Sequence, residues 1–154
     1  MDRIFCTYHD EETEQDLGCQ EPDLDEAIAA FRSFCWENVK PASSMKLLIF
    51  QTYGKEEASI WISAPLETRR WDVMASANVR RRFLGPFFKR KTRRLFADSG
   101  AAEVENLINI LFTYSLAEYV AFLDGNEAPT AALRLPTPTM QPQQQRPAQP
   151  GGPR

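Results

Sequence analysis

The chain is poor in the residues that most catalytic sites need. It has one histidine, His9, and only seven glycines among its 154 residues. Any Ser/His/Asp or Cys/His arrangement would have to use His9. No glycine-rich phosphate-binding loop, nucleophile-elbow motif or H-E-x-x-H motif occurs. We therefore predict no catalytic residues, no cofactor and no enzymatic activity.

A long apolar run is also absent. No stretch reaches the roughly 18 apolar residues that a membrane span requires, so none is expected. The N-terminal segment M-D-R-I-F-C-T-Y-H-D-E-E has neither the basic nor the apolar region of a secretory signal. We therefore expect a cytoplasmic or nuclear protein, not a secreted one, with its three cysteines reduced.

Cysteine and histidine are too scattered for a convincing metal site. Cys6, His9, Cys19 and Cys35 are the candidate ligands of a Cys3His zinc site. Cys6 and His9 fall in or at the end of a predicted strand, in which residues three apart point to opposite faces. Cys35 falls on the apolar side of a predicted helix, where a thiol usually packs as a small hydrophobe. We predict no metal site.

What the chain does have is a concentrated basic segment. Ten of its eighteen Lys and Arg residues lie between Arg69 and Arg94, against Asp72 alone. This segment is near +9, the remaining residues are near −12, and the net charge is −3. Such a block repels itself unless something negative lies against it. The candidates are nucleic acid, an anionic surface, another protein, or the chain's own N-terminus, where residues 1–26 hold ten acids and one base.

Hydrophobic periodicity predicts a strand first and then a helix. Residues 2–9 alternate as a short strand does, and the acidic residues 10–22 are expected to form a loop. Asp23 and Glu26 have the spacing of a capping box, which predicts a helix that ends at Lys40-Pro41. Two β-rich runs follow, 45–53 and 58–64, joined as a hairpin. In the second run Ile60 and Ile62 should face one way and Ser59, Trp61 and Ser63 the other.

The remainder of the domain is expected to be helical. The predicted helices cover 68–84, then a segment that opens at Pro86, and finally 101–123, which is closed by Asp124-Gly125-Asn126. The order β-α-β-β-α-α-α predicts an α+β fold, a small three-stranded antiparallel-type sheet with helices packed on one face. Residues 1–126 form the predicted domain, with a basic helical segment at 69–96. The Pro/Gln-rich residues 127–154 are expected to be a disordered tail.

The leading functional prediction is a non-enzymatic regulatory or accessory protein that binds an anionic protein partner through this basic helical segment. The alternative is an RNA or single-stranded DNA binding protein that uses the same residues, with basic groups on phosphates and phenylalanines stacked on bases. Those phenylalanines also fit the buried stripe of an amphipathic helix. The predicted binding residues are Arg80, Arg81, Arg82, Phe83, Phe87, Phe88, Lys89, Arg90, Lys91, Arg93 and Arg94.

Two further predictions concern the class of protein and its assembly. Size and class alone also fit small immunity or antitoxin-like proteins and viral accessory proteins. The helix predicted at 101–123 is apolar on more than one side, because Ile110, Tyr114 and Ala121 lie partly off the face that holds Leu107 and Leu111. That pattern predicts a homodimer through this helix, or a partner laid along it.

Overall fold

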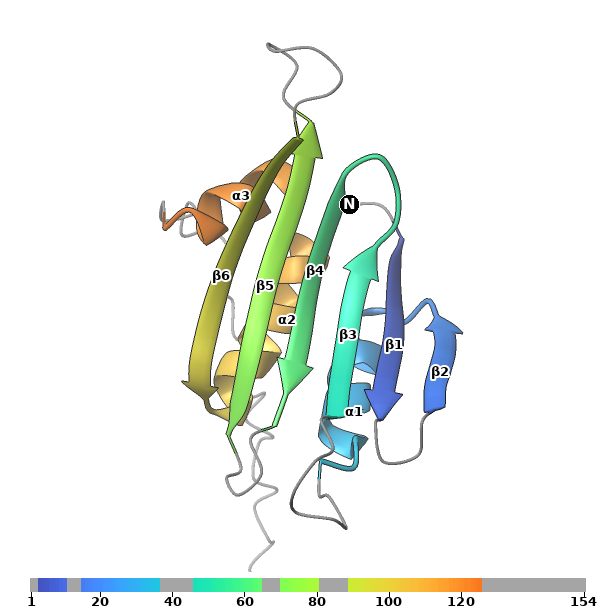
Figure 1. The fold of residues 1–154 in the computed structure, drawn as a ribbon. Helices are drawn as coiled ribbons and strands as arrows, with labels where there is room; N and C mark the ends of the chain where they lie inside the picture. Colours follow the sequence, from blue (N-terminus) through green and yellow to red (C-terminus); the bar gives the residue numbers. More distant parts are fainter. Residues whose placement is uncertain (1–2, 11–14, 37–45, 65–69, 81–88, 126–154) are drawn as a thin grey trace, which may run out of the picture.

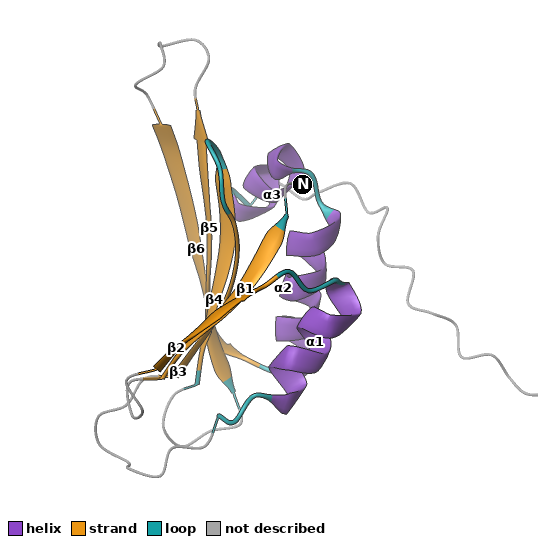
Figure 2. Ribbon diagram, turned by 90° about the vertical axis from the view of Figure 1, so that its right-hand side faces the viewer, coloured by secondary structure: helices purple, strands orange, loops and turns teal. Residues whose placement is uncertain are grey.

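The computed structural model describes residues 3–10, 15–36, 46–64, 70–80 and 89–125. Within them, six strands form one antiparallel sheet in the order β2-β1-β3-β4-β5-β6, and three helices lie on one of its faces (Figures 1 and 2). The strands are β1 (Ile4–Asp10), β2 (Gln15–Gln20), β3 (Lys46–Thr52), β4 (Glu57–Ser63), β5 (Trp71–Arg80) and β6 (Lys89–Ser99). The helices are α1 (Leu24–Ser33), α2 (Ala101–Thr113) and α3 (Leu116–Leu123). The class is α+β, but the prediction of a three-stranded sheet is wrong.

The core lies between the helices and the sheet face that they cover. Alternate residues of β3, β4 and β5 point into it, because side chains of a strand alternate between the two faces. Phe50, Ile60 and Ala75 are fully buried there. From the helices, the core receives Ala27, Phe31, Val104, Leu107, Ile108, Ile110, Leu111, Tyr119 and Leu123. The facing of Ile60 and Ile62 toward the core, with Trp61 exposed on the other side, confirms the prediction for this strand.

The largest correction concerns the predicted helices at 68–84 and after Pro86. Residues 71–80 form β5 and residues 89–99 form β6, and residues 81–88 lie outside the described part. In β5, Val73, Ala75 and Ala77 are buried while Met74 is exposed, which is a period of two. Trp71, Ala75 and Val79 are spaced four residues apart, which fits one face of a helix, but every fourth residue of a strand also shares one face.

A smaller correction concerns the acidic loop predicted at 10–22. Residues 15–20 form β2, which pairs with β1 in antiparallel fashion, with a register irregularity between Cys6 and Tyr8. Helix α1 then crosses to β3, which pairs with the other side of β1. Residues 15–20 of the predicted acidic loop therefore form one edge strand of the sheet.

The helix ends follow local capping chemistry. At α1 the Asp23 carboxylate accepts the Glu26 N–H at 2.8 Å and the Glu26 carboxylate accepts the Asp23 N–H at 3.0 Å, which confirms the predicted capping box. This helix ends at Ser33, earlier than the predicted stop at Lys40-Pro41. The predicted helix 101–123 is two helices, because Tyr114 leaves the helical conformation and Ser115 caps a new one.

Candidate protein-binding surface

The sheet face opposite the helices is here called the open face, because no described helix or strand covers it (Figure 2). The strand registers place Ile49, Trp61, Met74 and Leu95 in one row across β3, β4, β5 and β6. Trp61, Met74 and Leu95 are 44%, 42% and 59% exposed. We call these four residues the apolar row. An exposed apolar patch of this kind is a frequent mark of an interaction site.

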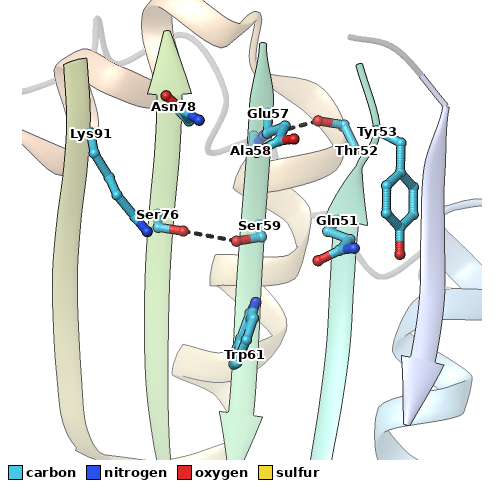
Figure 3. Close-up of a pocket in the computed structure, with 10 residues that line it drawn as sticks. All are labelled: Gln51, Thr52, Tyr53, Glu57, Ala58, Ser59, Trp61, Ser76, Asn78 and Lys91. Carbon is cyan, nitrogen blue, oxygen red and sulfur yellow. Dashed lines mark hydrogen bonds between the residues drawn. The ribbon is translucent and has the colours of Figure 1, made fainter. Parts of the chain in front are cut away.

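Polar rows lie beside the apolar row and contain a hollow. In register order they are Gln51, Ser59, Ser76 and Arg93, and then Glu57, Asn78 and Lys91. The hollow has a volume of about 180 Å³, and Figure 3 shows the side chains that line it, Trp61 at one end and Tyr53 at its β3 side. The Ser59 and Ser76 hydroxyl groups lie 2.9 Å apart and hydrogen-bond to each other. The hollow therefore offers hydroxyl, amide and ammonium donors beside an indole ring.

The strand geometry divides the basic residues of β6 between the two faces of the sheet. Lys91 and Arg93 lie on the open face with Leu95, and both are exposed. Arg90 and Arg94 lie on the helix side, opposite Val79 and Ala75. Among the described residues, Lys91 and Arg93 form no ion pair, so their charges face solvent on the same side as the apolar row.

Arg90 and Arg94 instead attach α3 to the sheet edge. The Arg90 guanidinium lies 2.6 Å from the Asp124 carboxylate. Arg94 donates to the Phe122 carbonyl oxygen at 3.2 Å, and its guanidinium lies 4.9 Å from the centre of the Phe96 ring. The Phe96 and Phe122 rings stack with their centres 5.8 Å apart. A guanidinium group near the face of an aromatic ring is attracted to it. These two arginines are thus engaged within the protein.

The other predicted binding residues are placed as follows. Arg80 is the last residue of β5 and pairs with Lys89, the first residue of β6. Arg81, Arg82, Phe83, Phe87 and Phe88 lie outside the described residues. Of the predicted binding residues, the structure therefore describes only Arg80 and those between Lys89 and Arg94. These residues lie on the paired strands β5 and β6 and not on a basic helix face.

Strand β2, which belongs to the acidic N-terminal zone, lies far from Lys91 and Arg93. Strands β2 and β6 are the opposite edges of the sheet, with four strands between them (Figure 1). At about 4.8 Å per strand, the two edges are about 24 Å apart. Residues 15–20 of the same molecule therefore do not cover Lys91 and Arg93.

Of the candidate metal ligands, the structure describes the side chains of Cys6, His9 and Cys35, whereas the side chain of Cys19 lies outside the described part. Cys6 and His9 are on opposite faces of β1, since they lie three residues apart in one strand, and Cys35 follows the end of α1. Within the described residues there is no group of three or more His, Cys, Asp and Glu side chains that would hold a metal ion. The strongest pKa shift belongs to Tyr119, because burial raises the pKa of its hydroxyl. That hydroxyl donates to the Ser59 carbonyl oxygen at 3.0 Å, which is a structural contact.

The apolar residues that suggested a dimer helix are largely covered inside the protomer. Ile110 is 7% exposed, and Tyr114 and Ala121 are half-buried. Tyr114 packs edge-on against Phe122 at 6.5 Å. The exposed apolar surface of the described residues is found on the open face of the sheet instead.

Comparison of the chain with protein-family models, with curated proteins and with solved structures gave no match. In the described part of the chain, every helix is too short or too polar to cross a bilayer.

The apolar row was missed because two of its four members, Met74 and Leu95, belong to strands that the periodicity assigned to helices. The available signal was Trp61, a large apolar residue between Ser59 and Ser63 on the polar side of its strand. A tryptophan at such a position indicates a contact surface, since indole is rarely left on a solvent face without a packing partner.

Proposed function

We propose that this protein is a non-enzymatic regulatory or accessory protein that binds an anionic protein partner on the open face, along its β6 side. The observation that carries the proposal is the position of Lys91 and Arg93 beside the exposed Trp61, Met74 and Leu95. Protein interfaces commonly combine an apolar centre with a charged rim that steers the partner. A partner with acidic residues next to apolar ones complements this surface.

Two features favour a protein over nucleic acid as the partner. The apolar row is mainly aliphatic, with Trp61 as its one aromatic ring, whereas single-stranded nucleic acid is bound by several stacking rings in succession. Glu57 also lines the hollow together with Lys91, and Asp72 lies at the end of the same face. Their carboxylates would repel a continuous phosphate backbone more than a peptide with spaced acids.

The test uses a labelled peptide, Thr-Glu-Thr-Glu-Thr-Leu-Thr, which carries two spaced acidic residues and one apolar residue. Its binding is measured by fluorescence anisotropy at about 50 mM salt, where charge contacts are weakly screened. A matched peptide with Gln in place of Glu and a single-stranded DNA of similar length are measured beside it. We expect the acidic peptide to bind more tightly than both. Stronger binding of the DNA would favour the nucleic-acid function instead.

A charge-matched pair of variants locates the site. Lys91→Glu with Arg93→Glu should weaken peptide binding by about tenfold or more, because two attractive contacts with the acidic side chains of the peptide become repulsive. Arg3→Glu with Lys55→Glu changes the net charge equally, before β1 and in the β3–β4 turn, and should stay within about twofold of the wild type, because neither residue belongs to the proposed site. Equal weakening in both variants would refute the proposed site. Circular dichroism checks that both variants fold.

A further inference from the structure

Strand β6 is an edge of the sheet with a long regular stretch. Among the described residues it pairs only with β5, from Lys89 to Phe96 without a register shift. The irregularity lies beyond, where Asp98 has a positive φ of 56° and its N–H donates to the Asp72 carboxylate at 2.9 Å. A bulge of this kind ends regular pairing on an edge strand. No other described strand pairs with the hydrogen-bonding groups of Lys89–Phe96 that face away from β5, which leaves them available to an added strand within the described part of the chain.

The charges on this edge decide which strands it accepts. Basic side chains on an edge strand oppose pairing with strands that are apolar or basic, which protects the protein from aggregation. They favour an acidic strand, because opposite charges on directly paired residues attract each other. On the helix side, Arg90 and Arg94 already contact Asp124 and Phe122. The exposed side chains of Lys91, Arg93 and Leu95 on the open face are left to contact the side chains of an added strand and so determine which strands bind.

We propose that β6 is a strand-addition site for an extended acidic segment of a partner protein. The added strand pairs with Lys89–Phe96 and places two acidic side chains opposite Lys91 and Arg93 and an apolar one opposite Leu95. Because only every second residue faces the open side, the recognised pattern is acid-x-acid-x-apolar, read in either chain direction. The apolar residue extends the apolar row by one strand. This inference rests on the proposed function and adds how the partner binds.

Segments of this chain do not fit that description. The tail 126–154 carries Arg134, Arg146 and Arg154 against Glu127 alone, so its charge is of the same sign as β6. Strand β2, which follows the acidic residues after β1 in the sequence, is the opposite edge of the sheet. The β2 edge of a second copy is a poor match, because Gln15–Gln20 carries one acid, Asp16, and a contact of β2 with β6 would be head-to-tail and not two-fold. The occupant that remains is an acidic strand of another protein.

Backbone N-methylation of the peptide Thr-Glu-Thr-Glu-Thr-Leu-Thr tests the pairing directly. In an added strand, only alternate N–H groups donate to β6, and the others point away. Two peptides are compared, one methylated on the Glu and Leu amides and one on the alternate Thr amides, with the same side chains and charge. We expect one set to lose about tenfold or more in affinity, because several backbone hydrogen bonds disappear together, while the other stays within about threefold of the parent.

The outcomes separate this inference from the proposed function. If both methylated peptides bind like the parent, or both weaken equally, strand addition is wrong, while the charge-reversal result still decides the function. If the parent peptide fails to bind, strand addition to β6 is also refuted. Amide chemical shifts should change most in Lys89–Phe96 and least in β2. Analytical ultracentrifugation that showed salt-sensitive oligomers of the protein alone, abolished by Lys91→Glu with Arg93→Glu, would assign the edge to a second copy and overturn the inference.

Discussion

Tyr119→Phe tests whether α3 is tied to the centre of the sheet by one buried hydrogen bond. Tyr119 is 1% exposed, and its hydroxyl donates to the carbonyl oxygen of Ser59 in β4 at 3.0 Å. Phenylalanine keeps the ring and removes only the donor. A typical intramolecular hydrogen bond contributes about 0.5–1.5 kcal/mol net, and a buried acceptor that loses its donor adds to the cost. We expect the free energy of unfolding to fall by about 1–2 kcal/mol, which lowers the melting temperature by roughly 4–10 °C.

The pH dependence gives this prediction a second, independent readout. Burial raises the pKa of the Tyr119 hydroxyl above its value in the unfolded chain, which is about 10. Its contribution to stability is therefore fully present below about pH 10 and is lost above it, where the unfolded chain gives up the proton and the folded protein keeps it. The expected slope is about 1.4 kcal/mol per pH unit. The advantage of the wild type over Tyr119→Phe should thus shrink above pH 10 and vanish within about one to two units.

Urea unfolding monitored by tryptophan fluorescence at pH 7 and at several values above pH 10 measures both quantities. Tyr53→Phe is the matched control, because Tyr53 is half exposed and makes an edge-on contact with Phe5 at 5.1 Å that phenylalanine preserves. Its stability should stay within about 0.5 kcal/mol of the wild type at pH 7. If Tyr119→Phe behaves like this control at every pH, the hydroxyl does not anchor α3 and the reasoning fails.

Two further predictions concern the C-terminal part of the chain. Ser115→Ala should lower the melting temperature, because it removes the cap of α3. Hydrogen bonds from the Ser115 hydroxyl and N–H lower the pKa of Glu118, so this stabilisation is present above about pH 4.3 and is lost as pH falls through the lowered pKa. Thermal scans at pH 7 and pH 3 should therefore show the melting temperatures of the variant and the wild type converging in acid. Truncation after Asn126 should leave the melting temperature nearly unchanged, since the prolines and glutamines of 127–154 offer few apolar groups to pack; a drop of many degrees in differential scanning calorimetry would move the domain boundary.

Local signals predicted the elements that have strong local chemistry. The start of α1 followed from Asp23 and Glu26, and the β3–β4 hairpin followed from two β-rich runs around a short turn. The break between α2 and α3 had the same kind of signal, Ser115 followed by Glu118, but the continuous apolar run on both sides obscured it. Capping residues were therefore better guides to helix ends than apolar periodicity.

Strands β5 and β6 were missed for a different physical reason. In β5 the core-facing residues Ala75 and Ala77 are small, and alanine favours helices when judged alone. Their burial between the sheet and the helices, not their propensity, makes them strand residues. In β6 basic residues occur on both faces, so no alternation of apolar and polar residues marks the strand. Only pairing with β5 defines it, and that contact is not visible in the local pattern.

The strand geometry also changes what the basic segment is able to do. On a helix, its charges would have formed one continuous face and engaged a partner together. On β6 they divide, since Arg90 and Arg94 are satisfied by Asp124 and by the carbonyl and ring of Phe122, while Lys91 and Arg93 face solvent. Fewer charges are then left for a partner than the +9 of the segment implies. The proposed recognition along β6 would therefore draw on backbone pairing and on the apolar row as well as on charge, and such a combination favours a spaced acidic strand over a uniform polyanion.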